Sequence, residues 1–377
     1  MRFAHSTYLV HSKRLLIILE GKIEELSKKL ATVVSCMLFL QLLLPFTSSA
    51  KRSDLADVKP TYWAVSSINK MVENGYMRVF EGGTFKPQQS STRAEVAETI
   101  VKVLQLPLDA TIQLKATDVQ VTHPQYEAFR KLVELNIFDN REQLHPEKFV
   151  TRSQIAKIIA QAFQIVVDEQ NESAFIDTRH CWAKHYIESL ADVGVITGKS
   201  NGSYGPYDDV TRAQLAILLT RALEFKKQVE KLEVAYDYLG KTYITTLQEH
   251  EPWVKKTIQL VNEEREKQTL SPLIQDPFLN QLAIIKVQDI LENKYFDHKS
   301  PYYGYPWDMA TLYDYEFSSL GENIARYLST PEEAMKAWMT SDTHRENMLK
   351  PTYTHMGVAI KKDDNGRYYW IQLFSSK

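Results

Sequence analysis

Apolar and polar positions divide the chain into regions of different periodicity. An apolar run without a charged residue covers residues 30–46. Residues 54–223 alternate irregular loops with short stretches in which apolar side chains recur every three or four positions. From residue 252 the helical spacing becomes cleaner, and the chain ends in two stretches that alternate with period two. This order predicts a helical first half followed by an α+β second half.

The helical first half contains an internal repeat. The signal Thr-Arg-Ala-Glu at residues 92–95 returns as Thr-Arg-Ser-Gln at 151–154 and as Thr-Arg-Ala-Gln at 211–214, with spacings of 59 and 60 residues. Each copy also carries a proline five residues before the threonine and a Gly or Asn where its first helix would end. Three such copies predict three helix-loop-helix units, at 51–111, 112–171 and 172–223.

The arginine of each signal has no local explanation. The threonine before it can accept the amide hydrogen three residues on, and the Glu or Gln can bond back, which is a capping box. A cation in the first helical turn is instead disfavoured by the helix dipole. Arg93, Arg152 and Arg212 therefore indicate either an anion bound at the helix start or a salt bridge to a carboxylate of a neighbouring repeat.

The second half, residues 252–377, follows a charged linker at 224–251 for which we expect a helix. The pattern then predicts helices over 253–265, from 277 after Asp276-Pro277, from 331 after Thr330-Pro331, and over 341–349. A terminal hairpin joins 357–361 to 368–374 around Asn365-Gly366, which is a two-residue turn signal.

Candidate chemistry lies in this second half. His298, Glu322, Glu333 and His344 stand within 47 residues of each other, and we expect the first two in loops between helices. Imidazoles bind zinc or exchange protons near neutral pH, while carboxylates orient them or act as bases. Each residue also has a structural explanation, because Glu333 completes a capping box with Thr330 and the others suit loops or helix starts. The sequence contains no HExxH motif and no nucleophile-elbow pattern.

The composition and the N-terminal segment indicate the compartment in which the protein acts. The formal charge of −2 shows no basic or acidic excess that would indicate a nucleic-acid partner. Residues 1–50 end in two lysines, the apolar run and small residues before Ala50, which predicts a cleaved secretory signal peptide; the alternative is an uncleaved anchor. After cleavage no transmembrane anchor is expected. Two cysteines, Cys36 and Cys181, exclude a disulfide framework, and we expect Cys181 to be buried.

The first half resembles three S-layer homology repeats. The resemblance rests on the Thr-Arg-Ala-Glu signal, Trp63-Ala64 and Trp182-Ala183, and the Gly-Thr-Phe-Lys-Pro loop at 83–87. It implies an all-α pseudo-threefold bundle that attaches exported proteins to secondary cell-wall polysaccharide, often pyruvylated. It further implies that the tryptophans stack on sugar and that Arg93 and Arg212 bind carboxylate. The middle copy has Pro124 in place of the tryptophan, so Arg152 is the weakest of the three sites.

The second half resembles the CAP superfamily (cysteine-rich secretory proteins, antigen five, pathogenesis-related proteins) in a cysteine-free bacterial form. The residues that carry the resemblance are Val261-Asn262, Arg265, 295–298, 321–325, Ala337-Trp338, 344–349, 354–358 and Tyr369-Trp370; Thr343 departs from the family's usual Gly. The resemblance implies an α-β-α sandwich with a cleft tetrad of His298, Glu322, Glu333 and His344. In several relatives the two histidines hold a divalent metal such as zinc.

Together the two resemblances imply a secreted protein at the wall or S-layer of a Gram-positive-type bacterium. Its repeats would bind wall polysaccharide and display a CAP domain that binds an unidentified ligand, metal or partner. An alternative is a metal-assisted extracellular hydrolase that acts on wall material or peptide, with His298 and His344 as metal ligands and a glutamate as base. A further alternative is a structural S-layer component.

Overall fold

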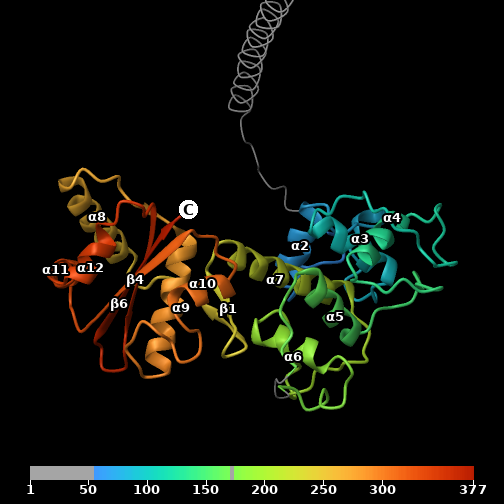
Figure 1. Ribbon diagram of the computed structural model, residues 1–377. Helices are drawn as coiled ribbons and strands as arrows, with labels where there is room; N and C mark the ends of the chain where they lie inside the picture. The colour runs from blue at the N-terminus through green and yellow to red at the C-terminus, as the bar shows by residue number, and fades with distance from the viewer. Residues whose placement is uncertain (1–54, 170–173) are drawn as a thin grey trace, which may run out of the picture. The chain divides into compact units, whose positions relative to one another are not determined.

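The computed structural model describes residues 55–169 and 174–377, and the predicted signal peptide lies outside these ranges. The first half contains three pairs of helices (Figure 1), with the bounds α2 Val65–Glu73, α3 Arg93–Val103, α4 Tyr126–Glu134, α5 Arg152–Ala162, α6 Lys184–Asp192 and α7 Arg212–Glu230. Within the described ranges, no helix combines the length and the apolar character that crossing a bilayer requires.

Contacts between the three repeats run in a closed cycle. The second helix of each repeat packs against the first helix of the next, as α3 on α4 and α5 on α6, and the cycle closes where α7 packs on α2. The backbone bonds behave alike: Val150 N–H donates to Ser91, Ser91 N–H to Val210, and Val210 N–H to Val150, at 2.8–3.0 Å. Each repeat therefore buries its apolar face only in the presence of both others.

The signal arginines take part in the same cycle. Each Nε donates to a carbonyl in the loop of the next repeat, from Arg93 to Leu144 at 2.6 Å, from Arg152 to Tyr204 at 2.8 Å, and from Arg212 to Phe85 at 2.7 Å. The loop that accepts this bond is itself held within its own repeat. Asp57, for example, accepts the amide hydrogens of Phe85 and Lys86, and Asp118 and Asp177 do the same in the other repeats.

The predicted helix signals are confirmed, with one correction. Thr92, Thr151 and Thr211 each cap their helix, and the left-handed residues Gly75, Asn136 and Gly194 follow the first helix of each repeat. Full capping boxes form in the second and third repeats. The first repeat lacks one, because the carboxylate of Glu95 instead forms an ion pair with Arg212 of the third repeat.

The prediction of a helical linker is wrong beyond Glu230, where α7 ends. Residues 234–245 form a hairpin of β1 (Val234–Asp237) and β2 (Thr242–Thr245), turning near Gly240. Ala235 and Ile244 pack in the core beside the C-terminal sheet, and Gln281 donates to the carbonyl of Val234. This tertiary burial favours the strand conformation in a segment with β-branched and aromatic residues.

The C-terminal region is a four-stranded sheet with helices. Its strands are β3 (Ile274–Gln275), β4 (Ser319–Arg326), β5 (His355–Lys362) and β6 (Tyr368–Ser376), in the order β3-β5-β6-β4. Its helices are α8 (Glu251–Lys267), α9 (Pro277–Glu292), α10 (Pro306–Leu312), α11 (Pro331–Thr340) and α12 (Asp342–Met348). The predicted terminal hairpin is confirmed as β5 and β6, but its turn is longer than the two residues expected, because Lys362 pairs with Tyr368 and only Gly366 of the turn is left-handed. Residues 319–326 form an edge strand and not the expected loop.

Two apolar cores pack on the sheet. One contains the buried face of α9, and the other contains residues of α8, α11 and α12; successive residues of β5 and β6 alternate between them. Gly357 permits the close contact of α9, since a Cβ atom at that position would lie 2.2 Å from the backbone carbon of Leu279. The predicted burial of Cys181 in the repeats is also confirmed.

Arg265 of α8 joins the second core to an irregular segment. Its side chain is fully buried and donates to the carbonyls of four residues, Ser271, Met348, Lys350 and Tyr353, at 2.8–3.3 Å. These bonds hold the segment between α12 and β5, whose backbone joins the sheet only at Thr354, where it donates to Ser375.

Replacing Arg265 with Met should therefore destabilise this region, because four carbonyls lose a charged donor. We expect a cost of about 3 kcal/mol, seen as roughly 100-fold faster amide hydrogen exchange in β5 and β6. Lys267→Met on the same helix removes an exposed pair with Glu264 and should change exchange less than threefold. Equal effects of the two substitutions would contradict the assigned role of Arg265.

Candidate functional site

Two members of the predicted tetrad meet between β4 and the loop that follows α9. His298 Nδ1 lies 2.8 Å from Oε1 of Glu322. The Glu322 side chain is only 2% exposed, whereas that of His298 is 47% exposed. A carboxylate on Nδ1 selects the tautomer with its proton on that nitrogen, which leaves Nε2 of His298 free to meet a ligand or a proton.

The loop that carries His298 is held from behind by a buried lysine. Lys286 of α9 is 1% exposed, and its ammonium donates to the carbonyls of Asp297 and His298 at 3.1 and 2.9 Å. It also donates to Tyr295 Oη at 3.0 Å, and that hydroxyl donates to Asp289. The lysine thus fixes the backbone on which the imidazole stands.

A second polar network positions Glu322 and His344 relative to each other. Asn323 is fully buried and donates to the carbonyl of His344 and to Gln372, at 3.0 and 3.1 Å. Asn347 donates to the carbonyl of Glu322 and to the amide oxygen of Asn323, at 3.1 and 3.0 Å. Side-chain amides of β4, β6 and α12 therefore tie the helix of His344 to the strand of Glu322.

The two histidines have pKa shifts of opposite sign. The hydrogen bond with the Glu322 carboxylate raises the pKa of His298. Burial, and the positive charge of His298, lower the pKa of His344. Burial raises the pKa of Glu322, while the hydrogen bond from His298 and the ammonium of Lys286 act in the opposite direction. Of the two imidazoles, His298 is thus the one that is protonated first as the pH falls, while His344 stays neutral.

Glu333 stands apart from this pair. Its own N–H donates to Thr330, which caps the helix, but its Oε2 accepts the amide hydrogen of Ser329 and not that of Thr330, so the predicted capping box is incomplete. Within the described ranges, no group of three His, Cys, Asp or Glu residues is arranged to hold a metal ion. Two imidazoles without a third described ligand do not form the three-ligand set of a catalytic zinc site, so we derive no step through a metal.

The His298–Glu322 pair lies at a cavity of about 340 Å³. Its walls come from the His298 loop, the start of α10, β4 and the segment after α12, and its lining residues are His298, Tyr305, Pro306, Trp307, Leu320, Gly321, Glu322, Asn347 and Tyr353. Oε2 of Glu322 is buried and receives no hydrogen bond from the described residues. This oxygen is therefore left as an acceptor that a bound water or a ligand donor can satisfy.

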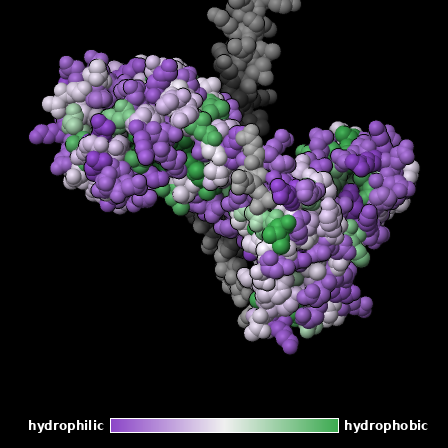
Figure 2. Space-filling model, turned by 90° about the horizontal axis from the view of Figure 1, so that it is seen from below, coloured by the Kyte–Doolittle hydropathy of each residue, from purple (hydrophilic) through white to green (hydrophobic). Residues whose placement is uncertain are grey.

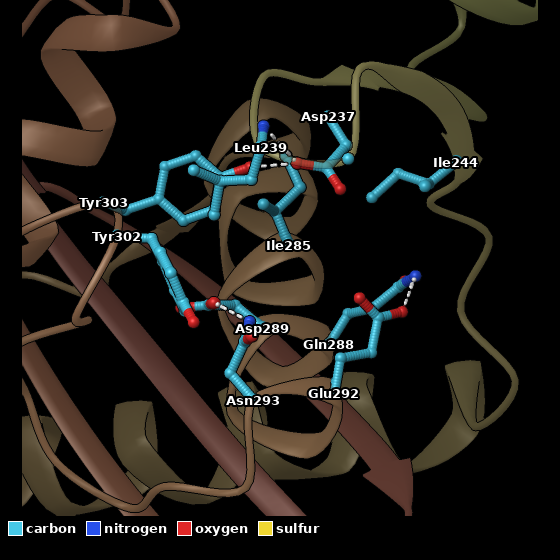
Figure 3. A pocket seen from close by; sticks show the side chains of 11 residues that line it. Asp237, Leu239, Ile244, Ile285, Gln288, Asp289, Glu292, Asn293, Tyr302 and Tyr303 are labelled. Atoms are coloured by element: carbon cyan, nitrogen blue, oxygen red, sulfur yellow. Dashed lines mark hydrogen bonds between the residues drawn. The ribbon is translucent and has the colours of Figure 1, made fainter. Parts of the chain in front are cut away.

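A second cavity of about 340 Å³ lies between the linker hairpin, α9 and residues 302–303 (Figure 3). Three carboxylates line it, but each already accepts a hydrogen bond, Asp237 from Tyr303, Asp289 from Asn293, and Glu292 from Gln288. The bond from Tyr303 ties the loop to the hairpin, and the other two lie within α9 and its C-cap, so the acidic groups that line this cavity have protein partners.

The candidate polysaccharide residues of the repeats differ in access. Trp63 and Trp182 are 61% and 55% exposed. Arg212 is fully buried, bonded to the carbonyl of Arg78 and paired with Glu95, which is the salt bridge left open as an alternative above. A ligand reaches Arg212 only if its guanidinium leaves that position.

Arg93 and Arg152 lack such a carboxylate partner. Gln154 and Gln214 occupy the sequence positions that correspond to Glu95, and no described carboxylate lies within salt-bridge distance of either arginine. Arg93 is partly exposed and Arg152 is buried, each over an aromatic ring.

The molecular face in Figure 2 is mostly hydrophilic, with small, separate hydrophobic areas. A few placed side chains, and not one broad patch, are therefore available for recognition on this face.

Several residues of the site were not among the predicted ones. Lys286 lies on a helix whose apolar pattern would place a lysine at the surface, so only its burial reveals its role. Asn323 and Asn347 belong to the motifs 321–325 and 344–349, and adjacency to Glu322 and His344 was their only signal. Gln372 lies within an apolar strand pattern. A buried polar residue inside an apolar pattern is the feature that could have indicated them.

Comparison with known proteins gives two family matches. Residues 258–374 match the cysteine-rich secretory protein family (CAP), and residues 54–97 and 175–216 match the S-layer homology domain. The uncharacterized protein YkwD of Bacillus subtilis is 45% identical over 123 residues, which are 33% of this chain and 47% of that protein. The surface-layer 125 kDa protein of Lysinibacillus sphaericus is 29% identical over 216 residues, which are 55% of this chain and 18% of that protein.

Solved structures also match in part. An extracellular protein containing a SCP domain from Bacillus anthracis aligns with 25% identity and a TM-score of 0.32, covering 40% of this chain and 50% of that one. The chain spans half or less of the length of each of these three proteins.

The pKa shifts lead to a test by nuclear magnetic resonance. His298 should titrate above the ordinary value of 6.5 and His344 below it. The stabilising contribution of His298 is therefore complete below pH 6.5 and is lost as the pH rises through its folded-state pKa. His344 has the opposite sign, so its contribution is lost as the pH falls below 6.5.

Histidine-labelled protein would report both pKa values. Glu322→Gln should lower the pKa of His298 and should raise the pKa of His344 only slightly. Glu333→Gln is the matched control and should leave both histidines unchanged. An unaltered His298 pKa in Glu322→Gln would show that the carboxylate does not hold the proton on the imidazole.

Proposed function

Since the chain carries S-layer homology repeats followed by a CAP domain, we propose that it is an exported protein whose repeats anchor it to cell-wall polysaccharide while the CAP domain binds a ligand outside the cell. The repeats place the protein at the cell surface. The observation that carries the binding proposal is the His298–Glu322 pair, since a fixed imidazole with a free nitrogen borders a cavity beside a buried carboxylate oxygen without a donor.

The architecture we propose is the one that both families imply. The cyclic contacts of the three repeats support a pseudo-threefold bundle. The two cores on the C-terminal sheet support an α-β-α sandwich. The proposed domain bounds are a signal peptide at 1–50, repeats at 51–111, 112–171 and 172–223, a linker at 224–251 and a CAP domain at 252–377.

For the wall contact we propose the exposed tryptophans and the accessible arginine. Trp63 and Trp182 present aromatic faces to solvent at corresponding positions of the first and third repeats. Arg93 combines partial exposure with a guanidinium that forms no ion pair with a described carboxylate, although Asp118 and Asp139 act on its charge from nearby, so it suits the carboxylate of a pyruvylated sugar. Arg152 and Arg212 would contribute to such grooves by holding the repeats together, because both are buried and bonded to loop carbonyls.

A hydrolase is the second candidate, favoured by the carboxylate–imidazole arrangement. Nε2 of His298 can accept a proton from water while Glu322 stabilises the imidazolium that forms. If the protein is a hydrolase, it should cleave wall fragments or peptides. This activity should disappear in His298→Ala and persist in Glu333→Gln, in which the substituted residue is exposed. Turnover that persists in His298→Ala would contradict this candidate.

Wall anchoring has a direct test. Removing Trp63 and Trp182 together, each by substitution with Ala, should weaken binding of the mature chain to purified walls at least tenfold, a loss of about 1.4 kcal/mol. Tyr302→Ala removes an equally exposed aromatic ring from the CAP domain and should leave wall binding unchanged.

The pyruvyl contact is tested separately with walls from which pyruvate has been removed. Wild type and Arg93→Gln should then bind equally, whereas on intact walls the variant should bind more weakly. Wall binding that is indifferent to both tryptophans and to Arg93 would overturn the proposed anchoring surface.

A further inference from the structure

We infer that the CAP cleft takes an uncharged pyranose ring of a glycan, stacked on Trp307 and held at its polar edge by Glu322 and its neighbours. This inference rests on the proposed function of the cleft as a ligand site, and names the chemical class of the ligand. The residues that carry it are an aromatic pair at one end of the cavity and a set of polar atoms at the other.

The aromatic pair stands where α10 begins. The rings of Tyr305 and Trp307 stack with centroids 4.7 Å apart and planes 15° apart, and they remain 40% and 46% exposed. Lys299 lies over the ring of Tyr305, 5.5 Å from its centroid. Trp307 covers one face of Tyr305 and the lysine approaches the ring as well, so the ring of Trp307 offers the larger open surface to a ligand.

The position of this surface is set before any ligand arrives. The hydroxyl of Ser300 accepts the amide hydrogens of Tyr302 and Tyr303, and Asp308 accepts that of Tyr305 at 2.8 Å. Ser300 and Gly304 also pair across the turn. A pre-ordered aromatic side chain loses little conformational freedom on binding, which favours a weakly interacting ligand such as a sugar.

The polar end of the cavity gathers around Gly321. A Cβ atom at this glycine would lie 2.3 Å from Tyr353 Oη and 3.0 Å from Asn347 Oδ1, so the absence of a side chain lets both oxygens approach the strand. Glu322 follows directly, and its buried Oε2 receives no hydrogen bond from the part of the chain that the structure describes. The described cavity thus combines several acceptors with the free Nε2 of His298.

These features distinguish between ligand classes. None of the residues lining the described cavity is a lysine or arginine, which disfavours a phosphate or another strong anion. One open aromatic surface does not form the cage that surrounds a quaternary ammonium group. Helices α10, α11 and α12 all contact the edge strand β4, which hinders pairing with an extended peptide. A pyranose has an apolar C–H face for the indole and a rim of hydroxyl donors for the acceptors.

The test uses chitotetraose, an uncharged oligosaccharide, and isothermal titration calorimetry of the mature chain. All proteins carry Trp63→Ala and Trp182→Ala, so that sugar binding by the repeats does not contribute. In this background we expect measurable binding. Trp307→Leu should weaken it at least tenfold, Trp307→Phe should weaken it less, and Tyr302→Ala, an exposed ring of the same loop outside this cavity, should leave it unchanged. Circular dichroism checks that each variant is folded.

Two results would overturn the inference. The first is that Trp307→Leu leaves the affinity for chitotetraose unchanged. The second is that chitotetraose does not bind, whereas an uncharged wall peptide binds in a manner that requires Trp307. Retention of wall-digest components, measured by native mass spectrometry, separates this failure from that of the proposed function. Components retained by wild type and lost in Glu322→Gln would keep the cleft as a ligand site of another class, and retention of none would remove the cleft from the proposal.

Discussion

Buried cations that donate to backbone carbonyls are the interaction on which the irregular parts of this protein depend. Arg212, Arg265 and Lys286 are all at most 1% exposed, and each donates to at least two carbonyl oxygens of loop or segment backbone. Loop carbonyls that leave water need a donor, and a charged donor makes a stronger bond than a neutral one. The same bonds satisfy the cation, whose burial would otherwise be costly.

This arrangement explains how loops can carry function without loss of geometry. In the repeats, the arginines tie each loop to the second helix of the preceding repeat in the cycle, and the exposed tryptophans stand on a scaffold that closes on itself. In the CAP domain, Lys286 holds the backbone of His298, and side-chain amides hold the strand of Glu322. Both candidate surfaces are therefore ordered before a ligand binds, which lowers the entropic cost of recognition.

The repeats and the CAP domain each carry a candidate recognition surface, and neither surface depends on a large net charge. Neither half needs a large charge, since the whole chain has a formal charge of −2. In the function that we propose, recognition instead depends on a small number of side chains: two tryptophans and an arginine in the repeats, and an indole, an imidazole and a buried carboxylate in the cleft. Such sites are selective because each polar group inside them must find its partner or remain unpaired.

The sequence by itself determined the features whose partners lie within a few residues. Thr92, Asp276 and Thr330 cap their helices, Asn136 takes the left-handed position after its helix, and Asn365-Gly366 turns the terminal hairpin. Each of these depends on one or two backbone hydrogen bonds over at most four residues, so the residue type is sufficient evidence. The family resemblances rest on several such local motifs together.

Only the tertiary structure decided what happens where the partner is distant. Arg212 bonds to a carbonyl 127 residues away and pairs with Glu95, which thereby gives up its own capping box. The linker forms a hairpin because Ala235 and Ile244 find a core, and residues 319–326 form a strand because β6 lies beside them. Glu333 lies in the first turn of a helix, whereas Glu322 joins His298. The local pattern allows each alternative, and the choice depends on burial and long-range partners that spacing along a chain does not encode.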